Sequence, residues 1–160
     1  MITIVPFEDI AEAVINKIKN KLQEKFNVDI KITKNKILPD TRKRGSQLLA
    51  NDFIPIIAIL SKDYGLGITN QDLYVPELNF VFGIALGKHC IISLARLKGN
   101  KLMERAVKEA VHELGHCYSL HHCPNPKCVM HFSNCLEDTD IKEENFCERC
   151  KNLLNKNFFS

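Results

Sequence analysis

The chain has 160 residues, of which 45% are hydrophobic and 26% are charged, and its formal net charge is +3. These values are typical of one soluble globular domain. The longest apolar stretches, such as residues 53–60, are too short to cross a bilayer, and no nucleic-acid-binding motif accompanies the modest charge.

No charged and apolar leader opens the chain, so we expect a cytoplasmic protein with no membrane or nucleic-acid partner. The basic run 42–44 is interpreted as a solvated loop. Five of the seven cysteines follow His122, and in a reducing compartment such clusters beside histidines indicate metal binding rather than disulfides. The sequence leaves the oligomeric state open.

The first sixty residues predict a β-α-β unit followed by a second helix. Residues 2–5 form a β-branched run, and apolar residues then recur at helical spacing from Phe7 to Phe26, with Glu8 and Asp9 in the first turn. Alternation over 28–32 predicts a second strand, parallel to the first. Residues 48–60 predict another helix, which Pro55 begins or kinks.

Strands dominate the predicted structure of the middle of the chain. We expect strands over 65–69 and 78–84, the latter because every second residue is apolar, and over 90–94 across the Gly87-Lys88 turn. Phe80 and Phe82, which share one face of the second of these strands, are interpreted as core residues.

A helix over residues 103–118 carries the strongest motif. Its apolar stripe leaves His112 and His116, four residues apart, on another face, where both can bind one zinc ion. Glu113 lies beside them as the general base of an HExxH zinc hydrolase. The third ligand should come from beyond the helix, and His121 and His122 both stand in that position.

Four later cysteines predict a second metal site. Their spacings are C-x4-C for Cys123 and Cys128 and C-x2-C for Cys147 and Cys150, typical of a closed, structural zinc site with four thiolates. A final helix over 148–157 begins at the second pair. The remaining cysteines are interpreted as small buried hydrophobes: Cys90, Cys117 and Cys135.

Together these residues resemble the archaemetzincin family, whose pattern is HExxHxxGxxH-C-x4-C-x-M followed by a distal CxxC. Residues 72–83 also resemble the segment that precedes the active-site helix in that family. The resemblance implies an α/β (α+β) fold: a compact metzincin-like domain with a mixed twisted sheet, an active-site helix and a zinc-stapled C-terminal part. We expect one domain, with a sheet and two helices in 1–100, the active-site helix and third ligand in 101–122, and the cysteine-zinc part in 123–160.

The resemblance also implies roles for single residues. It selects His122 as the third zinc ligand and places Met130 as a hydrophobic base beneath the metal. It places the 79–83 region near a sheet edge that binds an extended peptide. Ser119 stands where the family has glycine, which often has positive φ there. Two alternatives stay open: the serine adopts the same conformation at a cost of about 1 kcal/mol, or the turn differs.

The predicted function is therefore hydrolysis of peptide bonds by a zinc metallopeptidase. It uses two Zn²⁺ ions per chain, one catalytic and one structural, with Glu113 as general base and a peptide or protein as substrate. The alternative is a zinc-stabilised peptide-binding protein with little or no turnover. The sequence does not choose a second oxyanion donor among Tyr64, Tyr74 and Tyr118, nor does it distinguish cleavage within a chain from cleavage at an end.

Overall fold

The computed structural model describes residues 1–34 and 36–159. Its strands and helices, in chain order, are β1 (Ile2–Pro6), α1 (Glu12–Phe26), β2 (Ile30–Ile32), β3 (Lys43–Arg44), β4 (Gln47–Leu49), the 3₁₀ turn η1 (Ala50–Phe53), α2 (Ile54–Leu60), β5 (Tyr64–Thr69), β6 (Leu73–Val75), β7 (Leu78–Val81), β8 (Gly83–Leu86), β9 (His89–Ser93), α3 (Leu102–Cys117), α4 (Leu136–Ile141) and α5 (Glu148–Phe159).

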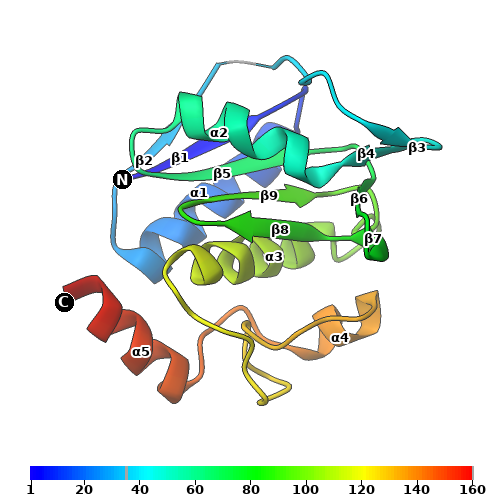
Figure 1. The fold of residues 1–160 in the computed structure, drawn as a ribbon. Helices are drawn as coiled ribbons and strands as arrows, with labels where there is room; N and C mark the ends of the chain where they lie inside the picture. Colours follow the sequence, from blue (N-terminus) through cyan, green and yellow to red (C-terminus); the bar gives the residue numbers. More distant parts are fainter. Residues whose placement is uncertain (35, 160) are drawn as a thin grey trace.

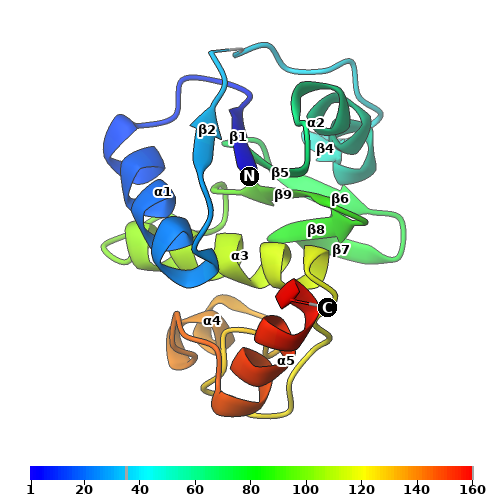
Figure 2. The same ribbon diagram turned by 90° about the vertical axis from the view of Figure 1, so that its left-hand side faces the viewer.

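A five-stranded sheet in the order β2-β1-β5-β9-β8 organises the molecule. Its first four strands are parallel, and β8 is an antiparallel strand at the edge. Helices α1 and α3 cover one face and α2 covers the other (Figures 1 and 2). A smaller four-stranded sheet, β3-β4-β6-β7, lies beyond β8 and β9. The predicted mixed α/β architecture is confirmed.

The alternation of side chains in β1 explains why both faces of the sheet are covered. Ile2 and Ile4 pack with α1 and α3, whereas Val5 packs in a second core with α2, and all three are fully buried. Such continuous burial is typical of a parallel strand with helices on both sides. Ile2 pairs in parallel with Ile30, which confirms the predicted β-α-β unit.

Helix α1 begins at Glu12, so the prediction that Glu8 and Asp9 form its first turn is wrong. Both carboxylate oxygens of Glu8 accept hydrogen bonds from Asn70 N, at 3.2 and 3.1 Å, which holds this segment at the end of β5. Phe7 packs edge to face against Phe53, with ring centroids 5.0 Å apart, in the α2 core and not on the α1 stripe. Tertiary contacts therefore outweigh the local helical spacing.

The prediction of one helix over residues 48–60 is correct only for its second half. Leu48 and Leu49 belong to β4, which pairs in parallel with β6, and a 3₁₀ turn separates β4 from α2. Pro55 lies in the first turn of α2, as predicted, where its missing N–H costs no helical hydrogen bond.

The predicted strand over residues 78–84 is two strands in different sheets. β7 pairs with β6 in the small sheet, while β8 pairs with β9 in the large sheet. The chain changes sheet at Phe82, whose carbonyl accepts a hydrogen bond from Ser93 N at 2.8 Å. The predicted hairpin between β8 and β9 is confirmed, and Gly87 has a φ of 63° in its turn.

Residues 118–159 pack against α3 on the side away from the sheet (Figures 1 and 2). Val129, Met130 and Leu154 belong to the same hydrophobic core as α1 and α3. From Ala106 onward, helix α3 is consequently buried nearly all round, and the polar residues of this part face an interior rather than solvent. Within the described part of the chain, no helix combines the length and the apolar composition that crossing a membrane requires.

Candidate metal centres and active-site cleft

Three histidines converge near the C-terminal end of α3. His112 and His116 project from successive turns of the helix, and their Nε2 atoms lie 3.2 Å apart. The ring of His122 lies 5.4 Å from that of His112 and 4.7 Å from that of His116, measured between centroids. Two nitrogens bound to one tetrahedral zinc at about 2.1 Å would be about 3.4 Å apart, so the arrangement fits a single ion.

Backbone carbonyls fix the orientation of two of these rings. Nδ1 of His112 lies 2.8 Å from Val129 O, and Nδ1 of His116 lies 2.8 Å from Leu120 O. A neutral imidazole that donates Nδ1–H to a carbonyl keeps the lone pair of Nε2 available for a metal. The donor set is therefore oriented for coordination by the structure around it.

The end of α3 explains how the third histidine reaches the cluster. Ser119 has a φ of 71°, so of the two alternatives the serine adopts the positive φ and the turn is kept. Ser119 N donates to His116 O and Leu120 N donates to Gly115 O, both at 2.9 Å, which is the Schellman arrangement. This turn reverses the chain, so that His122 joins the cluster while His121 stays exposed and outside it.

Burial dominates the electrostatics of the cluster. It lowers the pKa of His112, His116 and His122, so these rings are neutral at pH 7, the form that binds metal. Burial, and secondarily the Glu109 carboxylate, raises the pKa of Glu113 to about 8, although Lys142 partly offsets both effects. Without a metal, the Glu113 carboxyl is therefore mostly protonated at pH 7.

The histidines and Glu113 line one cavity of about 460 Å³. Residues of β7 and β8, with Phe82 between the two strands, line part of this cavity, and residues 132–134 line it as well. Phe82 is 8% exposed, in accordance with its prediction as a core residue, while Phe80 is only partly buried. Both phenylalanines thus pack in or against the core and also line the cavity.

Sequence reasoning missed two charged residues of this cavity. Glu109 precedes Glu113 by one helical turn, so the i, i+4 spacing was a signal that could have found it. Lys142 follows α4, a helix that had not been predicted, and no spacing connects it to the motif. Both side chains line the cavity and are almost completely buried.

None of the three tyrosines that remained open as oxyanion donors lines the cavity. Tyr64 and Tyr118 stack on each other with centroids 4.1 Å apart, beyond the end of α3. Tyr74 packs under the guanidinium of Arg44, 4.3 Å from its ring centroid. These contacts assign the three rings to packing rather than to the cavity.

Met130 packs against α3 at Gly115, one residue before His116. A Cβ at Gly115 would lie 2.4 Å from the Met130 sulfur, so any other residue there would force the methionine side chain to shift. Met130 is fully buried, and its carbonyl accepts a hydrogen bond from Cys123 N at 3.0 Å. The methionine therefore joins the helix that carries two histidines to the loop that carries the first two cysteines.

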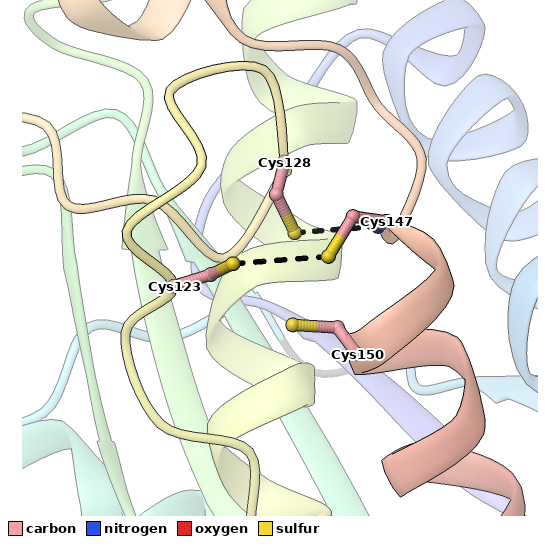
Figure 3. Close-up of side chains that lie close together, drawn as sticks. All are labelled: Cys123, Cys128, Cys147 and Cys150. Atoms are coloured by element: carbon pink, nitrogen blue, oxygen red, sulfur yellow. Dashed lines mark hydrogen bonds between the residues drawn. The ribbon is translucent and has the colours of Figure 1, made fainter.

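The four paired cysteines also converge, as Figure 3 shows. Cys123 and Cys128 come from the loop after α3, and Cys147 and Cys150 from the start of α5; their sulfurs all lie within 4.8 Å of one another. The Sγ atoms of Cys123 and Cys147 are 3.7 Å apart, close to the 3.8 Å or so expected for thiolates on one tetrahedral zinc.

Backbone N–H groups support the cysteine cluster. Cys128 Sγ accepts from Cys147 N at 3.4 Å and from Met130 N at 3.5 Å, contacts that stabilise a thiolate ligand. Burial would raise the pKa of the Cys147 thiol, but hydrogen bonds from the Cys150 backbone and the neighbouring thiols lower it to about 7.

The cysteines outside this cluster divide into two kinds. Cys90 and Cys117 are buried, as predicted. Cys135 is exposed, so the prediction of a buried hydrophobe is wrong there; it lies at the N-cap position of α4, without a side-chain capping hydrogen bond.

Comparison with known proteins connects this arrangement to one family. The model of "Peptidase family M54" matches residues 47–156. The chain is 41% identical to the archaemetzincin of Pyrococcus abyssi over 98% of its own length and 95% of the relative. It superimposes on the crystal structure of the archaemetzincin from Methanopyrus kandleri with a TM-score of 0.91 at 36% identity, covering 99% of this chain and 95% of that one. It also superimposes on the crystal structure of the archaemetzincin from Archaeoglobus fulgidus, with a TM-score of 0.84 at 32% identity, covering 95% of this chain and 98% of that one.

Proposed function

Because the chain belongs to peptidase family M54, the archaemetzincins, and is thus a zinc metallopeptidase, we propose that its histidine cluster holds the catalytic zinc and that Glu113 is the general base. The ligands in this proposal are His112, His116 and His122. One observation carries it: three neutral imidazoles converge on one point, beside a buried carboxyl, at the wall of an open cavity.

A zinc ion at this position supplies a Lewis acid that polarises the substrate carbonyl and makes water more acidic. Glu113 Oε1 lies 3.9 Å from His112 Nε2, so positive charge at the histidine cluster favours its ionised form. The carboxylate accepts a proton from the attacking water and then donates it to the leaving amine.

Gly83 of β8 positions this carboxylate. A Cβ at Gly83 would lie 3.0 Å from Glu113 Cγ and 2.5 Å from Ile91 O. The absence of a side chain therefore leaves space for Glu113 between α3 and the edge of the sheet.

We further infer that an extended peptide or protein segment binds along β8. This strand pairs only with β9 in the described sheet, and Gly83, Ile84 and Ala85 line the cavity. An unpaired edge can accept a substrate strand through main-chain hydrogen bonds, which require no particular substrate sequence.

The four clustered cysteines are assigned to a second, structural zinc, which gives two ions per chain. Four thiolates leave no position for substrate. The ion would join the loop after α3 to α5, and we infer that residues 1–160 act as one domain because the C-terminal part shares the core of the α1–α3 layer.

The test compares Glu113→Gln with Glu104→Gln, a matched change at an exposed position of the same helix. We expect Glu113→Gln to retain two zinc ions by metal analysis and to lose roughly 10²- to 10⁴-fold in peptide cleavage, while Glu104→Gln cleaves normally. Undiminished cleavage by Glu113→Gln would exclude its role as base. If the parent protein binds peptides from a broad library but cleaves none, the alternative function, peptide binding with little turnover, replaces this proposal.

A further inference from the structure

The three proposed zinc ligands are not held in place in the same way. A backbone carbonyl fixes the ring of His112 and another fixes the ring of His116, each at 2.8 Å. The ring of His122 is exposed and has no such hydrogen bond within the described part of the chain. The place of the third ligand therefore depends on the backbone beside it and on packing.

The backbone beside the third ligand is held by the segment that follows the cysteine loop. Cys123, the residue directly after His122, donates its N–H to Met130 O at 3.0 Å, and Nδ1 of His131 lies 2.8 Å from Cys123 O. A carbonyl oxygen only accepts, so Nδ1 of His131 carries a proton and donates it. Residues 130 and 131 thus bind both main-chain polar groups of Cys123.

His131 is itself held firmly enough to act as an anchor. Its N–H donates to Cys128 O at 2.9 Å, and its carbonyl accepts a hydrogen bond from Lys142 Nζ at 3.1 Å. Lys142 is fully buried, so this second partner does not move freely. A ring whose own backbone is fixed can hold Cys123 in place rather than follow its motion.

Two further contacts limit the movement of the third ligand. The Phe132 ring packs against the His122 ring, with centroids 5.2 Å apart. On the other side of the ligand, Leu120 N donates to Gly115 O at 2.9 Å, which ties the chain to the end of α3. Only residues 121 and 122 lie between this tie and Cys123, so the Cys123 hydrogen bonds determine how far His122 can depart from the cluster.

We propose that His131 is a positioning residue for the catalytic zinc: by holding the Cys123 carbonyl, it keeps His122 in reach of the ion that His112 and His116 share. The inference rests on the proposed function, because it takes the histidine cluster as a zinc site. Without the ring hydrogen bond, metal binding would have to order the backbone beside His122, and this ordering costs affinity. Groups that orient metal ligands typically contribute roughly 10- to 100-fold in metal affinity or activity.

Three variants of the full chain isolate the ring hydrogen bond. His131→Leu keeps a side chain of comparable bulk but removes the donor. His131→Asn restores a donor, because its Nδ2 is attached to Cγ as Nδ1 is in histidine. His121→Leu is the matched control, since His121 lies in the same loop but is exposed and outside the histidine cluster.

The measurement is the zinc affinity of the histidine cluster. Each zinc-loaded protein is equilibrated with increasing concentrations of the chelator dipicolinate, and the bound zinc is counted. A thiol reagent applied to the same samples separates the two sites, because only loss of zinc from the cysteine cluster makes its four thiols reactive.

We expect His131→Leu to bind the histidine-cluster zinc roughly tenfold more weakly than the parent, the lower end of the usual range, because His131 contacts the neighbour of the ligand and not the ligand. His131→Asn and His121→Leu should stay within about twofold of the parent. Parent-like affinity in His131→Leu, or an equal loss in either of the other two variants, would overturn the inference.

The tautomer of His131 in the zinc-loaded parent gives a check that needs no variant, in case His131→Leu does not fold. Nitrogen-15 NMR distinguishes the two neutral forms of a histidine ring. We expect the proton on Nδ1, with slow exchange against water. A proton on Nε2 alone would exclude the proposed role, because such a ring cannot donate to Cys123 O.

Zinc affinity and peptide cleavage together separate this inference from the proposed function. If His131→Leu weakens zinc binding at the histidine cluster but the parent cleaves no peptide, the positioning role holds and the proposed hydrolysis fails. If the parent cleaves peptides and His131→Leu binds zinc as the parent does, hydrolysis holds and the positioning role fails. A parent that binds no zinc at the histidine cluster overturns both.

Discussion

The histidine and cysteine clusters are supplied by neighbouring residues but are built differently. Cys123 directly follows His122, so one loop contributes to both. The histidine cluster has three donors and borders a cavity of about 460 Å³. The cysteine cluster has four donors, and backbone N–H groups contact its sulfurs.

From this difference we infer that the histidine cluster serves catalysis and the cysteine cluster stabilises the fold. Three donors leave one coordination position available to water or substrate, whereas four thiolates fill a tetrahedral ion. The cysteine cluster connects α5 to the loop after α3 (Figures 1 and 3). Between α3 and α5 the chain has one regular element, the short helix α4. We therefore expect loss of the cysteine site to affect mainly stability and loss of the histidine site to affect mainly activity.

Cys150→Ser should produce the largest effect on stability. Binding free energy in structural zinc sites is roughly 10 kcal/mol and is coupled to folding, so loss of one ligand should lower the free energy of unfolding by several kcal/mol. Denaturant unfolding and zinc analysis measure the change. Cys135→Ser is the matched control, because Cys135 is exposed and outside the cluster, and it should leave both quantities unchanged.

His122→Ala provides the other half of the comparison. His122 is exposed, so its truncation costs little packing, and the protein should keep its stability while losing one zinc ion and its peptidase activity. If His122→Ala unfolded the protein as readily as Cys150→Ser, the division into a catalytic and a structural site would be wrong.

Gly83→Ala should impair catalysis more than stability. The new Cβ would press on Glu113 Cγ and on Ile91 O, and small displacements of a catalytic group can cost about 10²-fold in rate. Gly67→Ala is a control for overpacking, because its Cβ would lie 2.6 Å from Ile57 Cδ1, in the α2 core. Equal losses of activity per unit of lost stability would argue against a positioning role for Gly83.

Proton release should distinguish the two sites during zinc binding. Burial raises the pKa of Glu113 to about 8, so this carboxyl is mostly protonated at pH 7 and should lose about one proton when positive charge arrives. Burial also raises the pKa of the Cys128 and Cys150 thiols, so the cysteine site should release on the order of two or more protons.

Calorimetric titration of the metal-free protein in buffers with different ionisation enthalpies measures these numbers. Glu113→Gln should abolish release at the histidine site and leave release at the cysteine site unchanged. Unchanged release at the histidine site in this variant would show that another group carries the proton.

Local signals predicted much of the fold, and they failed where distant partners decide the conformation. β1 and β2 followed from alternation and β-branching. Glu8 instead bonds to Asn70, and Leu48 bonds to the Asp72 carbonyl at 2.9 Å; a local pattern contains neither partner. Phe82 lies within an unbroken alternation, yet the chain changes sheet there.

Prediction of the candidate site was limited in the same way as prediction of the fold. Residues whose chemistry requires a fixed spacing, such as His112 and His116, can be found from one sequence, and the structure brings the proposed ligands together. Lys142 reaches the cavity through the packing of α4 on α3, with Lys108 Nζ donating to Thr139 O at 3.1 Å. Such a placement depends on tertiary structure, and no motif contains it.

Ser119→Gly should have the smallest effect, and it tests the turn that connects the two clusters. Ser119 adopts a φ of 71°, which costs a residue with a side chain about 1 kcal/mol relative to glycine. The glycine variant should therefore be more stable by about that amount in denaturant unfolding, with two zinc ions and unchanged cleavage, because the Leu120 carbonyl that orients His116 keeps its place. Ser119→Ala removes the hydroxyl but keeps the strain, so it should match the parent. Stabilisation by alanine as well would show that the hydroxyl, and not the backbone conformation, is responsible.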